Sequence, residues 1–374
     1  MAPSIGFGGT ERVVGRLANN LIKYYNVYLI LMHNSVDLPI DKRVNIIFLT
    51  QKKEHFNNTK LNKALTFCRS LKNYHKAIKS NNISICISFL ARQNIINGIY
   101  KLRVPKFKTI ISERCFPSNT YGKINKQLVS FFYNKNDCLF SNSAHINTDL
   151  QQNFKLKIPA YVIYNPINTL NKNPNFNSYN CTKSTFKIIA IGRLNPVKNH
   201  KNLIKSMVYL NESFHLNIYG IGILKQDLIQ LTKKLKVTNM VSLKGNSNSI
   251  NTEILSHHCL VLPSLSEGFP NVILEAMSLG VPVIATNCMS GPLELLNDNE
   301  DVYIKQGEFF KAKYGLLVNV NDEEALAKAI TYYKNNDDVR ETYSRLSFNK
   351  AKQFDITKIE LQVKDLIDNV LCAE

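Results

Sequence analysis

The segment at residues 259–286, CLVLPSLSEGFPNVILEAMSLGVPVIAT, constrains the fold of this chain more than any other. It reads as a short apolar strand, a polar turn, an amphipathic helix, a glycine stop and a second apolar strand, which is the pattern of a parallel βαβ unit. The turn follows the carboxyl end of the first strand, where open α/β sheets bind their ligands. Pro270 suits the first helical turn, so the backbone N–H groups of residues 271–273 are expected to face an anion such as a diphosphate.

Two glutamates lie in this segment, eight residues apart. Glu267 falls in the turn, and Glu275 falls inside the helix between Leu274 and Ala276. A carboxylate among apolar neighbours needs hydrogen-bond partners, and a ribose diol offers two hydroxyls to one carboxylate. For the bare spacing, a surface glutamate at each position is the simpler interpretation. The complete string is far more specific than the spacing.

A second loop in the same half of the chain carries two cations. In GRLNPVKN, Gly192 permits a tight turn after the strand expected at residues 187–191, and Arg193 and Lys198 follow it. Two cations five residues apart can converge on one ligand, although solvated loop charges would give the same pattern. A departing nucleoside diphosphate needs cations or a metal to take up its developing charge, and the chain has no D-x-D motif between its strands to hold a metal.

Several segments, taken in order, resemble the family 4 retaining glycosyltransferases. They are GFGGTERVVGRLAN, ISERCFP, VIYNPI, IAIGRLNPVKNHKNLI, SEGFPNVILEAMSLGVPVIAT and SGPLELL. The resemblance implies the α/β GT-B fold, in which two Rossmann-like domains face each other across a cleft. It also implies that Arg193 and Lys198 grip the donor diphosphate in place of a metal. Glu267 would contact the donor sugar, and Glu275 would bind the ribose hydroxyls.

The resemblance extends the donor site to a larger set of residues. These are Gly8, Gly9, Gly192, Arg193, Lys198, Gly220, Glu267, Gly268, Phe269, Pro270, Asn271, Val272 and Glu275. Gly8 and Gly9 belong to a glycine loop that is expected to face the donor across the cleft, and Gly220 is expected to border the nucleotide base. Glu267, Arg193 and Lys198 are the expected catalytic residues.

The acceptor side is marked less clearly by the sequence. Many members of the family carry a histidine after the strand that corresponds to residues 108–112, whereas this chain has Glu113 and Arg114 in ISER. A catalytic histidine is therefore not assignable, and Glu113 and Arg114 are the expected acceptor-side residues.

Alternating strand-like and helix-like runs predict two parallel α/β domains. We place an N-terminal, acceptor-side domain at residues 1–165, a linker rich in Asn, Pro and Ser at 166–185, and a nucleotide-sugar domain at 186–345. By resemblance, the helices of residues 346–374 return to pack on the first domain. Only five residues precede Gly6, too few for a central strand of typical length. Either the start lies upstream or the first strand is truncated.

Charge is distributed unevenly along the chain. Residues 1–180 hold 25 Lys and Arg against 7 Asp and Glu, whereas the remainder holds 22 against 21. A one-sided basic field predicts an anionic partner, which is a membrane surface, a lipid-linked phosphate or a nucleic acid. The helix expected near residues 60–80 is either a packed surface helix or one that docks on a membrane. Its expected apolar face consists of Leu61, Ala64, Leu65, Cys68, Leu71, His75 and Ile78. The lysines expected mostly elsewhere are Lys60, Lys63, Lys72, Lys76 and Lys79.

The composition of the chain also indicates in which cellular compartment the protein is expected. No apolar run reaches the roughly 18 residues of a membrane span, and the N-terminus lacks the pattern of a secretory signal peptide. Eight cysteines are scattered without C-x-x-C pairs, so neither a disulfide framework nor a zinc site is indicated. We therefore expect a cytoplasmic protein, peripheral on the cytoplasmic face of the membrane, with no cofactor and no metal.

By resemblance, the chain is expected to be a retaining, metal-independent glycosyltransferase. It would move a hexose or N-acetylhexosamine from a nucleotide sugar, with UDP as the expected nucleotide, to a growing lipid-linked glycan. A nucleotide-sugar 2-epimerase of the same fold is an alternative, although its acid and base residues cannot be placed. Another alternative is a non-catalytic basic protein that binds anions or nucleic acid, but no basic motif interleaved with aromatic residues supports nucleic-acid binding.

Overall fold

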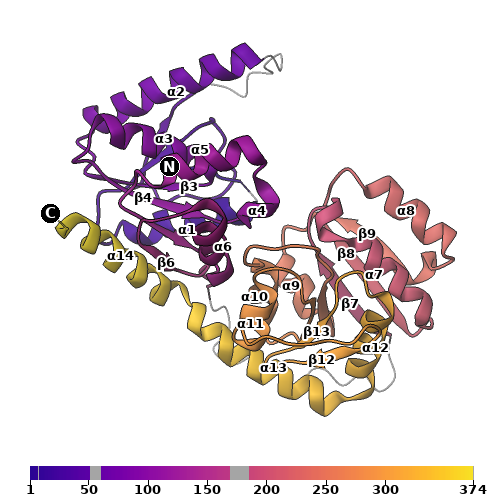
Figure 1. Ribbon diagram of the computed structural model, residues 1–374. Helices are drawn as coiled ribbons and strands as arrows, with labels where there is room; N and C mark the ends of the chain where they lie inside the picture. Colours follow the sequence, from indigo (N-terminus) through magenta and orange to yellow (C-terminus); the bar gives the residue numbers. More distant parts are fainter. Residues whose placement is uncertain (7, 51–59, 169–184, 374) are drawn as a thin grey trace. The chain divides into compact units, whose positions relative to one another are not determined.

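The computed structural model describes residues 1–6, 8–50, 60–168 and 185–373. The chain forms two compact units, shown in Figure 1. Unit 1 comprises Met1–Pro166 and Ile356–Glu374, and unit 2 comprises Ile167–Asp355. Of the linker expected at 166–185, residues 169–184 lie outside the described ranges.

Unit 2 is built on a sheet with seven strands among the described residues, in the order β12-β13-β11-β10-β7-β8-β9. Neighbouring strands are parallel except for the antiparallel pair β12 and β13. The strands are β7 (Phe186–Ile191), β8 (Phe214–Tyr219), β9 (Val241–Gly245), β10 (Cys259–Leu262), β11 (Val283–Thr286), β12 (Phe309–Lys311) and β13 (Leu316–Val318). Strands β10 and β11 are buried at every residue, because a parallel sheet covered on both faces has no polar side.

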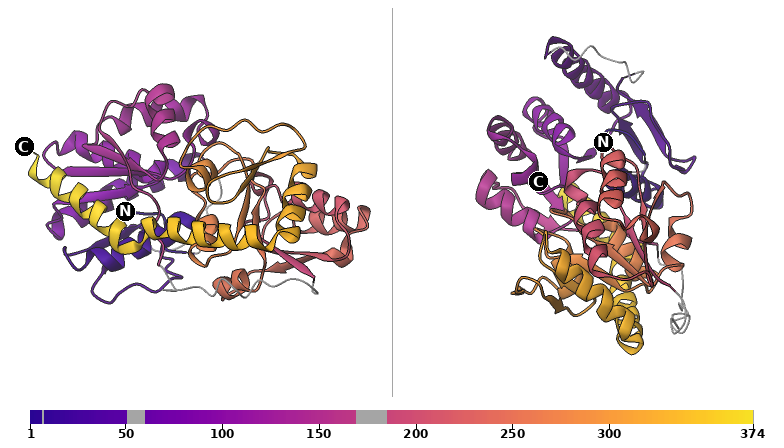
Figure 2. Two further views of the ribbon diagram at one scale, coloured as in Figure 1. Left: turned by 90° about the horizontal axis from the view of Figure 1, so that it is seen from below. Right: turned by 90° about the vertical axis from the view of Figure 1, so that its right-hand side faces the viewer.

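Helices pack on both faces of this sheet (Figure 2). One layer contains α7 (His200–Ser206), α8 (Lys225–Lys234) and α12 (Glu323–Asn335), and the other contains α9 (Ile250–Leu255), α10 (Asn271–Ser278), α11 (Pro292–Asn297) and α13 (Asp337–Ala351). The chain runs from β7 to β8 and β9 and then returns to β10 on the other side of β7. The strand order therefore reverses between β7 and β10, which is where such sheets bind ligands.

Unit 1 contains two parallel sheets among its described residues. The smaller pairs β1 (Tyr28–Leu31) with β2 (Asn45–Phe48). The larger has the order β3 (Ile85–Phe89), β4 (Lys108–Glu113), β5 (Cys138–Ser141) and β6 (Ala160–Val162). Helices α1 (Gly9–Leu21) and α14 (Ile356–Cys372) share one apolar core with the strands. The remaining helices are α2 (Lys60–Ser80), α3 (Ala91–Arg103), α4 (Pro117–Thr120), α5 (Lys123–Tyr133) and α6 (Ala144–Phe154).

The first residues of the chain lie between the two sheets of unit 1. On the side of β3, the Phe89 N–H donates to the Met1 carbonyl at 3.0 Å. On the side of β1, the Ala2 N–H donates to the Ile30 carbonyl and the Met32 N–H donates to the Ala2 carbonyl, both at 3.0 Å. No continuous strand forms over residues 1–5, where only isolated bridges occur. The space between the two sheets of unit 1 is therefore bridged by backbone hydrogen bonds over only a few residues at the start of the chain.

The return of the chain to unit 1 begins ten residues later than the expected boundary at 346. Helix α13 continues to Ala351 inside unit 2, and only α14 belongs to unit 1. Helix α14 buries Ile359, Val363 and Ile367 in the core that it shares with α1. The Lys23 ammonium of unit 1 also lies 2.8 Å from the Glu360 carboxylate of α14.

The apolar face expected for α2 is wrong in part. Leu65, Cys68 and His75 are exposed, whereas Tyr74 and Ala77 are buried together with Ile78. The side chains of Leu61 and Ala64 are not among those that the structure describes. The hydroxyl of Tyr74 reaches a buried amide on α3, so a tyrosine sets the orientation of the helix. The exposed placement expected for Lys72, Lys76 and Lys79 agrees with the structure.

Candidate functional site

Two loops meet at the point where the strand order of unit 2 reverses. The first follows β7 and carries Gly192, Arg193 and Lys198, and the second follows β10 and leads into α10. The Leu265 N–H in the second loop donates to the Val197 carbonyl in the first at 2.8 Å. This bond holds the two loops together at the carboxyl edge of the sheet.

A cation and a carboxylate from the two loops form an ion pair. The Lys198 ammonium lies 2.6 Å from Oε1 of Glu267, and the Ser264 hydroxyl donates to the same oxygen at 2.6 Å. The Lys198 backbone is fixed in a 3-10 turn (Pro196–Lys198), because Asn195 Oδ1 accepts from its N–H at 3.1 Å. A Cβ at Gly192 would lie 3.2 Å from the Lys198 side chain, so the glycine allows the lysine to pass closely.

Arg193 lies in the same loop and is exposed. No carboxylate among the described residues forms an ion pair with it. The positive charge of Arg193 is therefore available to a ligand. Its convergence with Lys198 on one diphosphate stays a prediction.

Helix α10 begins at Asn271, and Pro270 precedes it as the N-cap residue with an extended backbone. Pro270 therefore lies one residue before the first turn in which it was expected. The Ile273 N–H donates to the Pro270 carbonyl at 3.0 Å, so the prediction that this amide faces an anion is wrong. Glu275 lies on the next turn with only 4% of its surface exposed, as its apolar neighbours indicated.

Glycines make the close approach of these loops possible. Gly220, at the end of β8, has φ of +143°, and a Cβ there would lie 2.0 Å from the Gly192 carbonyl oxygen. Its N–H donates to the Gly245 carbonyl at 2.8 Å. Gly291 has φ of +76°, and a Cβ there would lie 2.5 Å from Pro270 Cδ. The ends of β7, β8 and β9, and the turn before α10, thus depend on residues without side chains.

The remaining predicted residues of the second loop support its shape. Phe269 is buried, with its ring centroid 5.7 Å from that of Phe354. The carbonyl of Gly268 accepts from the Ser290 hydroxyl at 2.8 Å. Val272 lies half-buried in the first turn of α10.

Three residues near the site were not singled out from the sequence. Ser264 orients Glu267, and Ser290 supports the turn before α10. His200 opens α7 behind the first loop, where burial lowers its pKa to about 4 and keeps the ring neutral. Ser264 follows a predicted buried strand directly, and that position was a usable signal for a site residue.

The glycine loop of unit 1 forms the start of α1. Gly8 is the N-cap residue, and its N–H donates to the Glu11 carboxylate at 3.2 Å. Gly9 is the first residue of the helix. The expected contact of Gly8 and Gly9 with the donor stays a prediction.

Glu113, expected on the acceptor side, lies in the interior of unit 1. Its carboxylate accepts hydrogen bonds from the hydroxyls of Tyr121 at 2.8 Å and Tyr133 at 2.7 Å, and from the Arg114 N–H at 3.0 Å. Burial raises the pKa of Glu113, and these hydrogen bonds oppose that rise. The contacts give Glu113 a structural function, and its contact with an acceptor stays a prediction.

Arg114 is also buried, with 6% of its surface exposed. Its guanidinium lies 5.3 Å from the ring centroid of Phe89 and 4.8 Å from that of Phe140. It donates to Asn165 Oδ1 at 2.8 Å. Burial lowers the pKa of Arg114 to about 9, so the group stays charged at pH 7. The two aromatic rings stabilise this buried cation, and its proposed contact with an acceptor is untested.

Within residues 1–6, 8–50, 60–168 and 185–373, no three His, Cys, Asp or Glu side chains are grouped as ligands of a metal ion would be. No helix in those ranges has both the length and the apolar character that a membrane span requires. The described cysteines are free thiols, and Cys181 lies outside the described residues.

Comparisons with known proteins identify the family. The family model for "Glycosyl transferases group 1" matches residues 171–353. Over 363 residues the chain is 31% identical to the N-acetylgalactosamine-N,N'-diacetylbacillosaminyl-diphospho-undecaprenol 4-alpha-N-acetylgalactosaminyltransferase of Campylobacter jejuni, and the alignment covers 95% of each chain. The chain belongs to the group 1 glycosyltransferases.

Further similarities agree with this assignment. A second C. jejuni enzyme, the GalNAc-alpha-(1->4)-GalNAc-alpha-(1->3)-diNAcBac-PP-undecaprenol alpha-1,4-N-acetyl-D-galactosaminyltransferase, is 26% identical over 375 residues, which are 98% of this chain and 97% of that enzyme. The crystal structure of HepE from Anabaena in complex with UDP matches with a TM-score of 0.76 and 17% identity, covering 98% of both chains. The predicted GT-B fold of this group 1 glycosyltransferase is confirmed.

Proposed function

We propose that this group 1 glycosyltransferase belongs to family 4 and is a retaining, metal-independent enzyme. It transfers an N-acetylhexosamine or a hexose from a UDP-sugar to a lipid-linked glycan. The observation that carries the proposal is the Lys198–Glu267 pair, 2.6 Å apart, at the switch point of the unit 2 sheet. The names of the two C. jejuni relatives support the sugar and the acceptor, since both describe N-acetylgalactosamine transfer to undecaprenol-diphosphate-linked glycans.

The reaction needs positive charge next to the bond of the donor that is cleaved. The bond between C1 of the sugar and the phosphate oxygen cleaves, and a hydroxyl oxygen of the acceptor forms the new bond at C1 from the same face. The acceptor proton passes to the departing phosphate, and UDP leaves. Lys198 and Arg193 stabilise the negative charge that develops on the diphosphate. The exposed Arg193 and the oriented Lys198 support this role, because both lie in one loop.

Glu267 is suited to hold the sugar as well as to orient Lys198. Both Lys198 and Ser264 bond to its Oε1. Its Oε2 is therefore left to accept a hydrogen bond from a sugar hydroxyl. Because the same side chain contacts the lysine and the sugar, it sets the position of C1 relative to the cation. Glu275 binds the ribose hydroxyls from its buried position in α10.

The two carboxylates are expected to act on different parts of the donor. Glu275→Gln should weaken UDP binding about tenfold or more, because a hydrogen bond to a charged group contributes about 1.5–3 kcal/mol. Glu267→Gln should leave UDP affinity within about threefold of wild type while it reduces turnover, because its proposed partner is the sugar. Calorimetry with UDP and with UDP-N-acetylgalactosamine measures both effects. Wild-type UDP affinity in Glu275→Gln would contradict the ribose contact.

We further propose that the enzyme is cytoplasmic and binds the cytoplasmic membrane face peripherally through its basic N-terminal part. Residues 1–180 hold 25 basic against 7 acidic residues, and the exposed lysines of α2 contribute to that field. A lysine near an anionic surface contributes about 1 kcal/mol of attraction. The attraction falls with salt, because the Debye length is only about 8 Å at physiological ionic strength.

Reversing the charge of α2 should therefore reduce vesicle binding. The variant Lys72→Glu, Lys76→Glu, Lys79→Glu should bind vesicles with anionic lipid at least about tenfold more weakly than wild type in a flotation assay. The matched control reverses three exposed unit 2 lysines, Lys225, Lys233 and Lys236, and should have a clearly smaller effect. Equal binding of wild type to neutral and anionic vesicles, or equal losses in the two variants, would rule out this surface.

A further inference from the structure

An arginine lies buried at the carboxyl edge of the larger sheet of unit 1. Arg114 directly follows β4, Asn142 directly follows β5, and Asn165 comes after β6. The Arg114 Nη1 group donates to Asn165 Oδ1 at 2.8 Å, and Asn142 Nδ2 donates to the same oxygen at 3.5 Å. Three neighbouring strands therefore bring polar side chains together at the edge where parallel α/β sheets bind ligands.

One side of the Arg114 guanidinium has no hydrogen-bond partner. In a guanidinium, Nε–H and one N–H of Nη2 point in the same direction, and this Nε–Nη2 edge matches two oxygens of one phosphate. The Nε of Arg114 is buried and unpaired. None of the described residues accepts a hydrogen bond from Nη2, because the bond to Asn165 comes from Nη1. Unlike Nε, Nη2 is not fully buried, so a ligand reaches the Nε–Nη2 edge from the side of Nη2.

The carboxylate next to Arg114 in the sequence does not neutralise it. Successive residues of a strand point to opposite faces of the sheet. Glu113 reaches Tyr133 of α5 on one face, and Arg114 contacts the ring of Phe140 on the other, where α1 and α14 pack. Two tyrosine hydroxyls and two backbone N–H groups already donate to the oxygens of Glu113. No carboxylate in the part of the chain that the structure describes forms an ion pair with the Arg114 guanidinium.

A buried cation without an anion is costly. Removing an ion from water carries a desolvation penalty, which an oppositely charged partner normally offsets. The rings of Phe89 and Phe140 offset part of this penalty through cation–π contact. Burial lowers the pKa of Arg114 to about 9, so the guanidinium still carries its charge at pH 7. A buried charge with an unpaired Nε–Nη2 edge therefore needs an explanation beyond packing.

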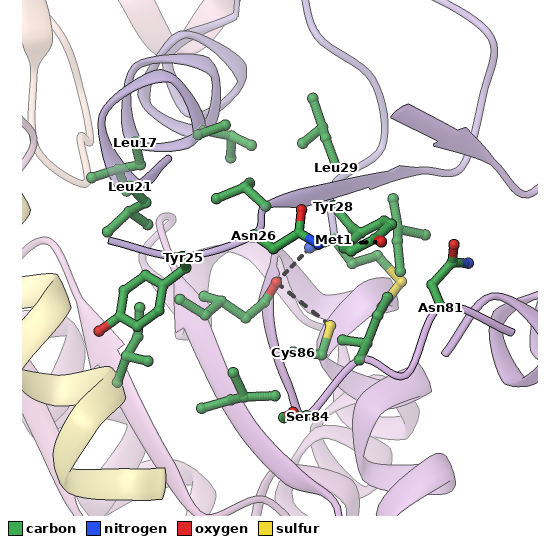
Figure 3. A pocket seen from close by; sticks show the side chains of 18 of the residues that line it. Met1, Leu17, Leu21, Tyr25, Asn26, Tyr28, Leu29, Asn81, Ser84 and Cys86 are labelled. Atoms are coloured by element: carbon green, nitrogen blue, oxygen red, sulfur yellow. Dashed lines mark hydrogen bonds between the residues drawn. The ribbon is translucent and has the colours of Figure 1, made fainter. Parts of the chain in front are cut away.

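The cavity of unit 1 is a separate feature. It has a volume of about 340 Å³ and lies among Leu17, Leu21, Leu29 and neighbouring side chains (Figure 3). Phe89 lines this cavity, but Arg114 does not. No Lys, Arg or His side chain is among the described residues that line it, so the cavity does not suit an anion. The place in unit 1 that suits an anion is the sheet edge at Arg114.

We propose that Arg114 is an anion subsite of unit 1 and that it holds one phosphate group of a diphosphate through its Nε–Nη2 edge. The choice of this anion rests on the proposed function. Both substrates of that reaction contain a diphosphate, one in the UDP-sugar and one in the link between the glycan and its lipid, whereas a hexose or an N-acetylhexosamine has no carboxylate. Two phosphate oxygens form parallel hydrogen bonds with the Nε–Nη2 edge, a geometry that an ammonium group does not match.

The Nε–H signal of Arg114 tests the subsite in the protein without any substitution. Nitrogen–proton NMR detects arginine Nε–H groups that are shielded from solvent, and through-bond correlations assign them. Titration with inorganic pyrophosphate at pH 7 should shift the Arg114 signal until it saturates. The Nε–H signal of Arg340, which is buried in unit 2 and ion-paired with Asp337, should not shift. An Arg114 signal that does not respond to pyrophosphate would overturn the proposal.

Titration with UDP distinguishes the two sources of the diphosphate. If the acceptor supplies it, pyrophosphate should still shift the Arg114 signal when UDP saturates the protein. If the donor supplies it, UDP alone should shift the signal, and pyrophosphate should then cause no further change. Either result supports the subsite. These titrations involve no glycosyl transfer, so a failure of the proposed function would leave the subsite standing and remove only the assignment of its source.

The variant Arg114→Lys keeps the positive charge but removes the Nε–Nη2 edge. The KM for the substrate that supplies the diphosphate should rise at least about tenfold, because hydrogen bonds to charged groups are lost. Arg92 of α3 lies over the ring of Phe67 in the same unit but is exposed, so Arg92→Lys should keep both KM values within about twofold of wild type. If Arg114→Lys melts at the wild-type temperature and both KM values are unchanged, Arg114 does not hold a phosphate. If the variant does not fold, the titrations of the wild-type protein decide.

Discussion

Replacing Lys198 with methionine should reduce kcat by about 100-fold or more. Methionine keeps the apolar stem that passes Gly192, but it removes the ammonium that lies 2.6 Å from Glu267. The charge that develops on the leaving diphosphate would then lose a preorganised cation, and loss of one such contact typically reduces turnover by about 10²–10³. Release of UDP from UDP-N-acetylgalactosamine with a lipid-linked acceptor measures the effect.

A surface lysine from the same unit controls for the loss of charge. Lys205 on α7 lies 3.6 Å from Glu323 and is about as exposed as its partner, so Lys205→Met should keep kcat within about twofold of wild type. Both variants should unfold at temperatures close to wild type. Addition of EDTA should leave wild-type turnover unchanged. A fully active Lys198→Met enzyme, or loss of wild-type activity with EDTA, would exclude a lysine that replaces a metal.

The parts of the fold that follow from continuous apolar runs were predictable. Strands β10 and β11 are apolar at nearly every position and buried on both faces, so their sequence could fit only the centre of a parallel sheet. Because parallel strands end at one edge, the sequence alone was enough to place the loops after β7 and β10 at the same edge of the sheet. The strand order that makes the two loops neighbours, and the ion pair of Lys198 with Glu267, are seen only in the structure.

Other features depend on contacts between residues far apart in sequence, which no local pattern contains. The sequence marks Glu113 as an acceptor-side residue at the end of a strand, yet Tyr133 and Tyr121 from later in the chain enclose its carboxylate. Helix α2 turns its tyrosine inward because a hydrogen-bond partner lies on α3. The return to unit 1 starts at Ile356 and not at the expected residue 346. The boundary was missed because the sequence of a polar helix such as α13 does not indicate the unit on which the helix packs.

Replacing Gly220 with alanine should destabilise unit 2 by about 3–5 kcal/mol. The new Cβ would lie 2.0 Å from the Gly192 carbonyl oxygen, which cannot move without shifting the loop that carries Arg193 and Lys198. The φ of +143° adds backbone strain of about 1–3 kcal/mol for any residue with a side chain, and overpacking adds a similar amount. Thermal unfolding should show a fall of about 10 °C or more, and donor binding should be lost with it.

Alanine substitutions at two other glycines distinguish the cost of backbone strain from the cost of steric overlap. Gly245 also has a positive φ, +73°, but a Cβ there would meet nothing within 4 Å, so Gly245→Ala should show the cost of strain alone. Gly15 lies inside α1 with only ordinary contacts at 3.5 Å, and Gly15→Ala should be neutral or stabilising by about 0.5–1 kcal/mol. The expected order of stability is therefore Gly15→Ala, then Gly245→Ala, then Gly220→Ala. If Gly220→Ala and Gly245→Ala unfold at the same temperature, the backbones of Gly192 and Gly220 do not approach closely in solution. The loop that positions Lys198 must then be held by other contacts.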